Sequence, residues 1–178
     1  MKGFKAWWGA ILLTAAVGLL AALPATAAAV GSYDNAAIAN YALARVGQQG
    51  GQCRQFVNDV VWAVSGHTQN IGGGNGAFAN LAANGIEITD INSLVKGDVV
   101  QFENSPVITP LHTFIIVSRA SGNTFNVVDS NWVAFEKVGT HQITFTLDSR
   151  TRRAFRFGTV TAPPPPTDHR PLPCRRSR

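Results

Sequence analysis

The sequence predicts an α+β domain in which N-terminal helices pack on an antiparallel β-sheet. Three observations support this fold class. Apolar residues recur at helical spacing as far as about residue 84. From Val99 onward the pattern changes to short apolar runs that are separated by turn residues, which is typical of hairpins. Because the helices come first and the strands follow, we expect separate helical and sheet layers rather than alternating βαβ units.

The first helix is predicted to follow Asp34, which can cap it, and to end at Gly47. Its buried face is expected to carry Ala37, Ile38, Tyr41, Ala42 and Val46.

The second helix is predicted from Cys53 to about Ser65, with Gly66 as its stop. Its buried face is expected to hold Phe56, Val57, Val60, Val61 and Val64. A glycine-rich segment at 72–76 lacks the lysine of a phosphate-binding loop, so it indicates a loop or cleft rim. A short helix over 78–84, ended by Gly85, follows it.

The sheet is predicted to begin after a turn at 96–98, with a strand over Val99–Phe102. A loop with Pro106 and Pro110 leads to a second strand over 112–118. The turn signal at 121–123 then predicts a hairpin with a third strand over 124–129. Two more strands are expected near 142–147 and 153–157.

Cys53 is the candidate nucleophile, because it stands at the predicted start of a helix, behind a glycine turn. A helix N-terminus presents unpaired N–H groups and the positive end of the helix dipole, and both favour a thiolate over a thiol. His112 follows as a candidate base, and Asp129 and Asn131 as candidate orienting groups. Most lone cysteines are small buried hydrophobes, so the residue alone does not establish catalysis.

The predicted hairpin brings these polar residues to one edge of the sheet. His112 lies near one end of its strand, and Asp129 or Asn131 lies near the far end of the next. Either could accept a hydrogen bond from one ring nitrogen and leave the other to face the sulfur. For an oxyanion, the candidate donors are the Cys53 backbone N–H and the Gln52 side chain. His141 opens a predicted strand, where it either lines the cleft or has a structural role.

The N-terminus resembles a secretory signal. Lys2 and Lys5 precede an uncharged run over 6–23, and Ala25-Thr26-Ala27 fits a signal peptidase site. We therefore predict a signal peptide over 1–28 and a secreted or cell-wall protein, periplasmic in a Gram-negative cell. An uncleaved membrane anchor is the alternative, since the run has about the length of a short membrane span.

The C-terminus, 161–178, is predicted to be a proline-rich, basic, disordered tail. This tail and the signal together carry the net charge of +5. The intervening segment has no net charge, which argues against nucleic-acid binding. An arginine group at 150, 152, 153 and 156 is expected to lie on a solvated strand face. Residues 29–160 are long enough for one domain that folds without disulfides, and a Cys53–Cys174 bridge is the less favoured alternative.

Four motifs together resemble the CHAP family of cysteine- and histidine-dependent amidohydrolases/peptidases, which are relatives of the NlpC-type cell-wall peptidases. The motifs are Gly51-Gln52-Cys53-Arg54-Gln55-Phe56-Val57, Lys96-Gly97-Asp98-Val99-Val100-Gln101-Phe102, His112-Thr113-Phe114-Ile115-Ile116-Val117 and Val127-Val128-Asp129-Ser130-Asn131-Trp132. The resemblance implies a papain-like fold and cleavage of amide bonds in peptidoglycan. It implies Cys53 as nucleophile, His112 as general base and Asp129 or Asn131 as the third member.

Two positions depart from the family pattern. Leu111 stands where the family usually has glycine, and Asp129 where it commonly has glutamate. The second change leaves open whether Asp129 or Asn131 orients the ring.

Two functional classes follow from these observations. The first is a secreted cysteine hydrolase of peptidoglycan, either an endopeptidase or an N-acetylmuramoyl-L-alanine amidase. The second is an inactive domain of the same fold that binds wall fragments or a protein partner. We expect a monomer without a cofactor or stable membrane insertion, and no metal, because Cys53, His112 and Asp129 lack the spacing of zinc ligands.

Overall fold

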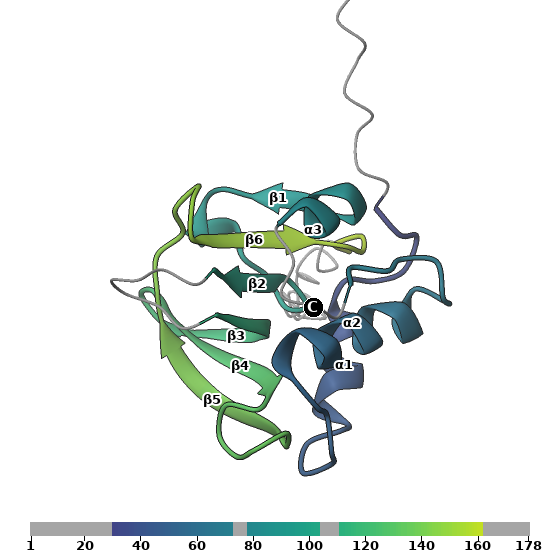
Figure 1. Ribbon diagram of the computed structural model, residues 1–178. Coiled ribbons are helices and arrows are strands. Elements are labelled where there is room, and N and C mark those ends of the chain that lie inside the picture. Colours follow the sequence, from purple (N-terminus) through teal and green to yellow (C-terminus); the bar gives the residue numbers. More distant parts are fainter. Residues whose placement is uncertain (1–29, 73–77, 104–110, 162–178) are drawn as a thin grey trace, which may run out of the picture.

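The computed structural model of the protein contains a six-stranded antiparallel sheet, against which the helices pack (Figure 1). The structure describes residues 30–72, 78–103 and 111–161. The predicted signal peptide, the proline-rich tail with Cys174, and the loop containing Pro106 and Pro110 lie outside this part of the chain, as does most of the glycine-rich segment. The α+β class and the antiparallel sheet are confirmed.

The strands follow the order β1-β6-β2-β3-β4-β5 across the sheet. They are β1 (Ile86–Ile88), β2 (Val99–Phe102), β3 (His112–Ser121), β4 (Thr124–Ser130), β5 (Val138–Thr144) and β6 (Arg152–Arg156). The predicted hairpin is the β3–β4 pair, in which Ile115 lies opposite Val128. The last strand, β6, lies between β1 and β2 and pairs with both, so the edge strands of the sheet are β1 and β5.

Two longer helices, α1 (Ala36–Leu43) and α2 (Cys53–Val64), pack against the middle of the sheet (Figure 1). A short helix, α3 (Ala79–Asn84), and a 3-10 turn, η1 (Ile91–Ser93), complete the described elements. The second helix has nearly the predicted bounds. Its residues Phe56, Val57, Val60 and Val61 are fully or almost fully buried, and Val64 is partly buried.

Apolar side chains fill both faces of the sheet. On the helical side, α1 and α2 contribute to a cluster with Val99, Ile115, Val128 and Phe155. The opposite face carries a second cluster, built around Phe102, Phe114, Phe125 and Phe145. Because successive strand residues point to opposite faces, β2, β3 and β4 supply both clusters and read as nearly continuous apolar runs.

The first helix is shorter than predicted. It ends at Leu43, and the chain continues through turns to Gly47, so Val46 is exposed. Tyr41 is also exposed, and the buried face is Ile38, Ala39 and Ala42. Asn35 rather than Asp34 is the N-cap, although the Asp34 carboxylate accepts a hydrogen bond from the Ala36 N–H. Because this helix consists largely of alanines, its sequence gives little contrast between the buried and the exposed face.

The strand boundaries also differ from the prediction at the edges of the sheet. The fifth strand begins at Val138 and ends at Thr144, although it was predicted over 142–147. The three-residue strand β1 was not predicted. Its pairing with β6 depends on a partner about 70 residues away, which local propensity does not reveal.

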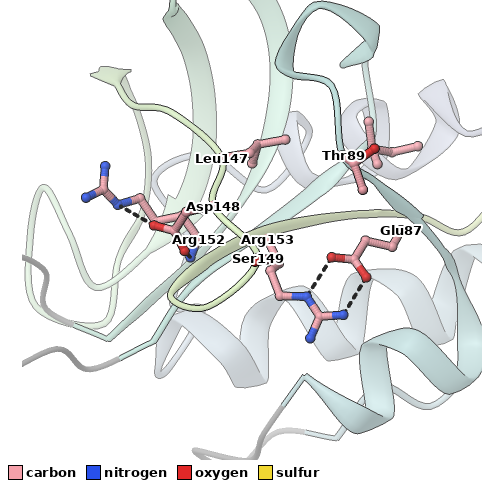
Figure 2. A pocket seen from close by; sticks show the side chains of 8 residues that line it. Glu87, Thr89, Leu147, Asp148, Ser149, Arg152 and Arg153 are labelled. Atoms are coloured by element: carbon pink, nitrogen blue, oxygen red, sulfur yellow. Dashed lines mark hydrogen bonds and ion pairs between the residues drawn. The ribbon is translucent and has the colours of Figure 1, made fainter.

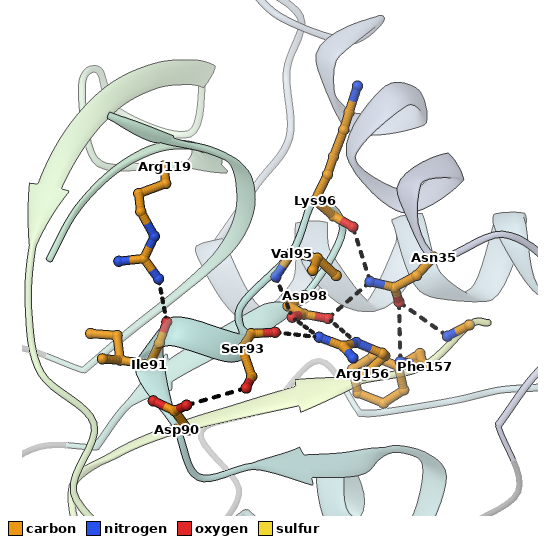
Figure 3. A network of polar contacts seen from close by, with 11 residues as sticks. Asn35, Asp90, Ile91, Ser93, Val95, Lys96, Asp98, Arg119, Arg156 and Phe157 are labelled. Carbon is orange, nitrogen blue, oxygen red and sulfur yellow. Dashed lines mark hydrogen bonds and ion pairs between the residues drawn. The ribbon is translucent and has the colours of Figure 1, made fainter. Parts of the chain in front are cut away.

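A buried carboxylate network ties the two ends of the domain together (Figure 3). Asp98 is fully buried and accepts hydrogen bonds from the Arg156 guanidinium at 2.8 and 2.7 Å and from the Asn35 amide at 2.9 Å. The Asn35 side-chain oxygen in turn accepts from the backbone N–H groups of Phe157 and Gly158. The start of α1, the turn before β2 and the end of β6 are therefore held at one point.

Within the described ranges, no helix is long and apolar enough to cross a membrane.

Candidate active site

The start of α2 holds Cys53 beside the start of β3 and the end of β4. Gln52 is the N-cap with an extended backbone, and Gly51 before it has a φ of +70°, which favours glycine. The Ser130 hydroxyl at the end of β4 donates to the Gly51 carbonyl at 2.7 Å. A Cβ on Gly50 would stand 2.6 Å from that same hydroxyl oxygen, so this close approach of loop and strand needs glycine. Cys53 itself is partly exposed.

His112, the first residue of β3, binds Asp129 from β4. Its Nε2 lies 2.9 Å from the Asp129 Oδ2, and the two side chains are 3% and 0% exposed. The sequence predicted that either Asp129 or Asn131 would lie within reach of His112. In the structure the hairpin brings Asp129 to it. Asn131 is directed elsewhere, because it has a φ of +66° and its amide donates to the Gln52 Oε1 at 3.0 Å.

Cys53 and His112 shift each other's proton affinity in opposite directions. Burial raises the pKa of Cys53, but the hydrogen bond and charge of His112, with backbone hydrogen bonds from Thr113 and Arg54, bring it below its ordinary value. Burial lowers the pKa of His112, but the hydrogen bonds and charges of Asp129 and Cys53 outweigh it and raise the pKa to about 9. Both shifts favour a thiolate beside an imidazolium.

The Gln52 side chain is held in a polar network above the start of α2. Its Nε2 donates to the Glu136 Oε1 at 3.3 Å, and Gln49 donates to the other oxygen of that carboxylate at 3.0 Å. The Asn131 Oδ1 accepts from the Glu136 backbone N–H. Gln52 is thus oriented by Asn131, and its amide has a second N–H, so it can still act as a donor to a ligand.

A cavity of about 300 Å³ opens beside these residues. It is lined by Gln52, Cys53, Arg54, Leu111, His112, Asn131 and Trp132. The sequence-predicted nucleophile, base and oxyanion donor all line it, whereas Asp129 lies fully buried behind the histidine. Leu111, which departs from the family pattern, is one wall of the cavity.

Two residues beside the site, Arg54 and Trp132, were not predicted, and His141 is the histidine for which the sequence allowed either a cleft or a structural position. Arg54 is buried beside the nucleophile and donates to the Gly72 and Ile71 carbonyls and to Gln101, which holds the chain after α2 against the helix start. Trp132 is 45% exposed and packs on His112 with ring centroids 4.5 Å apart. His141 lies inside β5, with its Nδ1 3.5 Å from the Asp129 Oδ2. Arg54 follows Cys53 and Trp132 follows Asn131 in the sequence, and this proximity to candidate residues was the available signal for both.

A second pocket, between β1, β6 and the segment before β6, has a different character (Figure 2). Its arginines are paired with carboxylates: Arg153 donates two hydrogen bonds to Glu87 at 2.7 and 2.5 Å, and Arg152 lies 3.7 Å from Asp148. With Arg156 bound to Asp98, three of the four clustered arginines make ion pairs within the domain. They do not form the solvated face that was expected, and their charges are largely neutralised.

Over the residues that the structure describes, no group of three or more histidine, cysteine, aspartate or glutamate side chains has an arrangement that could hold a metal ion.

Comparison with known proteins leaves the family unassigned. No family model matches the chain, and no curated protein matches it. Among solved structures, the crystal structure of Ly7917 is similar over 70% of this chain and 62% of that one, with a TM-score of 0.47 and 12% identity. The crystal structure of Ly7917 with the hydrolyzing product of MDP is similar over 70% of this chain and 63% of that one, with a TM-score of 0.46 and 14% identity. The chain thus spans less than two thirds of these proteins, and likeness at this level does not define its function. The CHAP resemblance stays a prediction from motifs.

Proposed function

We propose that this protein is a cysteine hydrolase that cleaves amide bonds in peptidoglycan, with Cys53 as nucleophile, His112 as acid and base, and Asp129 as the group that orients His112. One observation carries the reaction type: a cysteine whose pKa is lowered by His112 lines the same open cavity as that histidine, and the histidine Nε2 lies 2.9 Å from the buried Asp129 carboxylate. This is the arrangement of an activated nucleophile with its base and orienting group.

The reaction follows from the charges of the pair. The Cys53 thiolate attacks the carbonyl carbon of the amide and forms a tetrahedral intermediate. The C–N bond then breaks, and the His112 imidazolium gives its proton to the leaving amine, which leaves a thioester on Cys53. Water, deprotonated by His112, attacks the thioester, and the released thiolate and the imidazolium restore the starting state.

The oxyanion of the intermediate needs hydrogen-bond donors. The start of α2 supplies the backbone N–H of Cys53 and the positive end of the helix dipole. The Gln52 amide lines the same cavity and is oriented by Asn131, so we assign it as the side-chain donor.

The substrate class rests on the four motifs that resemble the CHAP family and on the secretory signal expected over 1–28. An exported hydrolase with this site meets peptide and sugar–peptide amides in the cell wall. The proposal therefore includes export to the cell wall or medium, and it covers both an endopeptidase and an amidase.

Digestion of purified peptidoglycan from several wall types tests the proposal. The purified protein is compared with Cys53→Ala, and the products are identified by mass spectrometry. New free amines in the wild-type digest alone are the expected result, and the fragment masses identify the bond. Near-ultraviolet circular dichroism controls for the fold of the variant.

Two results together would contradict an enzymatic role: no release from any wall type, and alkylation of Cys53 no faster than that of a free thiol. They would favour the alternative class, an inactive domain that binds wall fragments or a protein partner.

A further inference from the structure

The buried carboxylate of Asp129 faces two histidines. His112 on β3 lies 2.9 Å from the Asp129 Oδ2, and His141 on β5 lies 3.5 Å from the same oxygen through its Nδ1. The His141 side chain is 15% exposed and Asp129 is fully buried. The proposed reaction uses His112 alone, so the second histidine needs its own explanation.

The register of the sheet explains why His141 reaches Asp129. Asp129 lies opposite Gly139 in the β4–β5 pair, and His141 lies opposite Val127. Residues two apart on a strand share a face, so the His141 ring stands beside Asp129 on the same side of the sheet. Gly139 has no side chain that could come between them.

Trp132 covers this group from outside. Its ring stacks on His141 with centroids 5.5 Å apart and an angle of 9° between planes, and it also packs on His112 at 4.5 Å. The tryptophan contacts both histidines and also lines the cavity beside Cys53. A change at His141 can therefore reach the reactive pair through Asp129 and through Trp132.

Hydrogen bonding around Asp129 is incomplete. Its Oδ1 and both ring nitrogens of His141 are buried and have no hydrogen-bond partner among the described residues. A buried carboxylate is costly unless N–H groups compensate it, and His112 supplies one. The Nδ1 of His141 is the nearest further nitrogen, at a distance that a small rotation would turn into a hydrogen bond.

We propose that His141 is a positioning residue that, as an N–H donor at Nδ1, holds the Asp129 carboxylate toward His112. This inference rests on the proposed function, because it assigns His141 a role in the same site. The titratable groups that face His141 in the described structure are Asp129 on β4 and His112 on β3. Burial, and the charge of His112, lower the pKa of His141 against the opposing effect of Asp129, so the ring is a neutral donor near neutral pH.

Two variants separate a donor role from a stacking role. His141→Asn keeps an amide N–H near the position of Nδ1 but loses the ring. His141→Phe keeps a ring that can stack on Trp132 but has no donor. His67→Phe is the matched control, because His67 lies in an exposed turn after α2. Should phenylalanine not be accommodated, His141→Leu serves as the second variant without a donor.

The measurements are the pKa of His112, from its ring signals in NMR spectra, and the rate of Cys53 alkylation by iodoacetamide between about pH 5 and about pH 9. Loss of the donor in His141→Phe is expected to lower the His112 pKa from about 9 by about one unit. Because an imidazolium that is held less firmly stabilises the Cys53 thiolate less, the Cys53 pKa is expected to rise and alkylation at acid pH to slow about tenfold. His141→Asn and the His67 control are expected to match the wild type.

A wild-type profile for His141→Phe would overturn the proposal, and so would equal losses in His141→Phe and His141→Asn. Neither measurement needs a substrate, so a protein that failed to digest peptidoglycan would still decide the role of His141.

Discussion

At the scale of single residues, the proposed reaction needs a thiolate on Cys53 and a proton on His112 at the same pH. The lowered pKa of Cys53 and the His112 pKa of about 9 define a pH window in which the thiolate and the imidazolium coexist. We expect activity to fall as the pH rises through about 9, because the imidazolium that protonates the leaving amine is lost. It also falls in acid, when the thiolate is protonated.

Asp129→Asn tests the upper limit of this window. Asp129 raises the pKa of His112, so removal of its charge should move the alkaline limit of kcat/KM to lower pH. The value at the optimum should fall about a hundredfold or more. Asp59→Asn, at an exposed carboxylate on α2, is the control and should retain the wild-type pH profile. An unchanged alkaline limit in Asp129→Asn would contradict the assigned role.

Gln52→Ala tests the oxyanion donor. Loss of one such donor typically lowers kcat by about 10² to 10³, with little change in substrate binding. Gln55→Ala is the matched control, because Gln55 is an exposed glutamine on the first turn of the same helix, bonded to Asp59. Steady-state kinetics on a released wall peptide would distinguish them, and equal kcat values for both variants would exclude Gln52 as a donor.

At the scale of elements, tight turns place the helices and strands that carry the site. Gly97 stands in the turn before β2 with a φ of +91°, and a Cβ there would meet the Asn35 backbone oxygen at 1.8 Å. Gly122, in the β3–β4 turn, also has a positive φ of +48°, but a Cβ there would meet nothing within 4 Å. Both glycines have a positive φ, but they differ in their surroundings.

Alanine substitutions at these glycines should therefore differ in cost. Gly122→Ala pays for the left-handed backbone alone, about 1 kcal/mol in the free energy of unfolding. Gly97→Ala adds a clash with backbone and should cost about 3 kcal/mol or more. Urea denaturation measures both, and a similar loss in the two variants would show that the contact with Asn35 yields easily.

At the scale of the whole molecule, one buried ion pair joins segments that are far apart in the chain. Asp98 before β2, Arg156 at the end of β6 and Asn35 before α1 meet at the same carboxylate (Figure 3). A buried carboxylate that loses its cation keeps its desolvation cost.

Arg156→Gln should therefore lower the free energy of unfolding by about 3 kcal/mol. Arg152→Gln, at the other end of β6, removes a more exposed pair with Asp148 and should cost less than about 1 kcal/mol. Thermal and urea unfolding of the two variants provide the comparison. A larger loss in Arg152→Gln would mean that the Asp98 network is not the point that holds the domain together.

Local sequence patterns were sufficient to predict several of the helices and strands of this protein. The bounds of α2, the β2 strand and the β3–β4 hairpin follow from apolar periodicity and turn residues, which act over short stretches of chain. Cys53 at the start of a helix and His112 at the start of a strand were recognisable for the same reason. The end of α1 and the short strand β1 were not, because exposure and pairing depend on partners distant in the sequence.

The sequence by itself therefore determined the α+β class and the set of polar residues at one edge of the hairpin. Only the tertiary structure decided which of them meet. Asn131 has a positive φ and donates a hydrogen bond to Gln52, whereas Asp129 binds His112. Trp132 packs on both His112 and His141. The physical reason is that strand register and loop conformation set side-chain contacts to within an ångström, and both are fixed by packing across the whole domain rather than by the neighbouring residues.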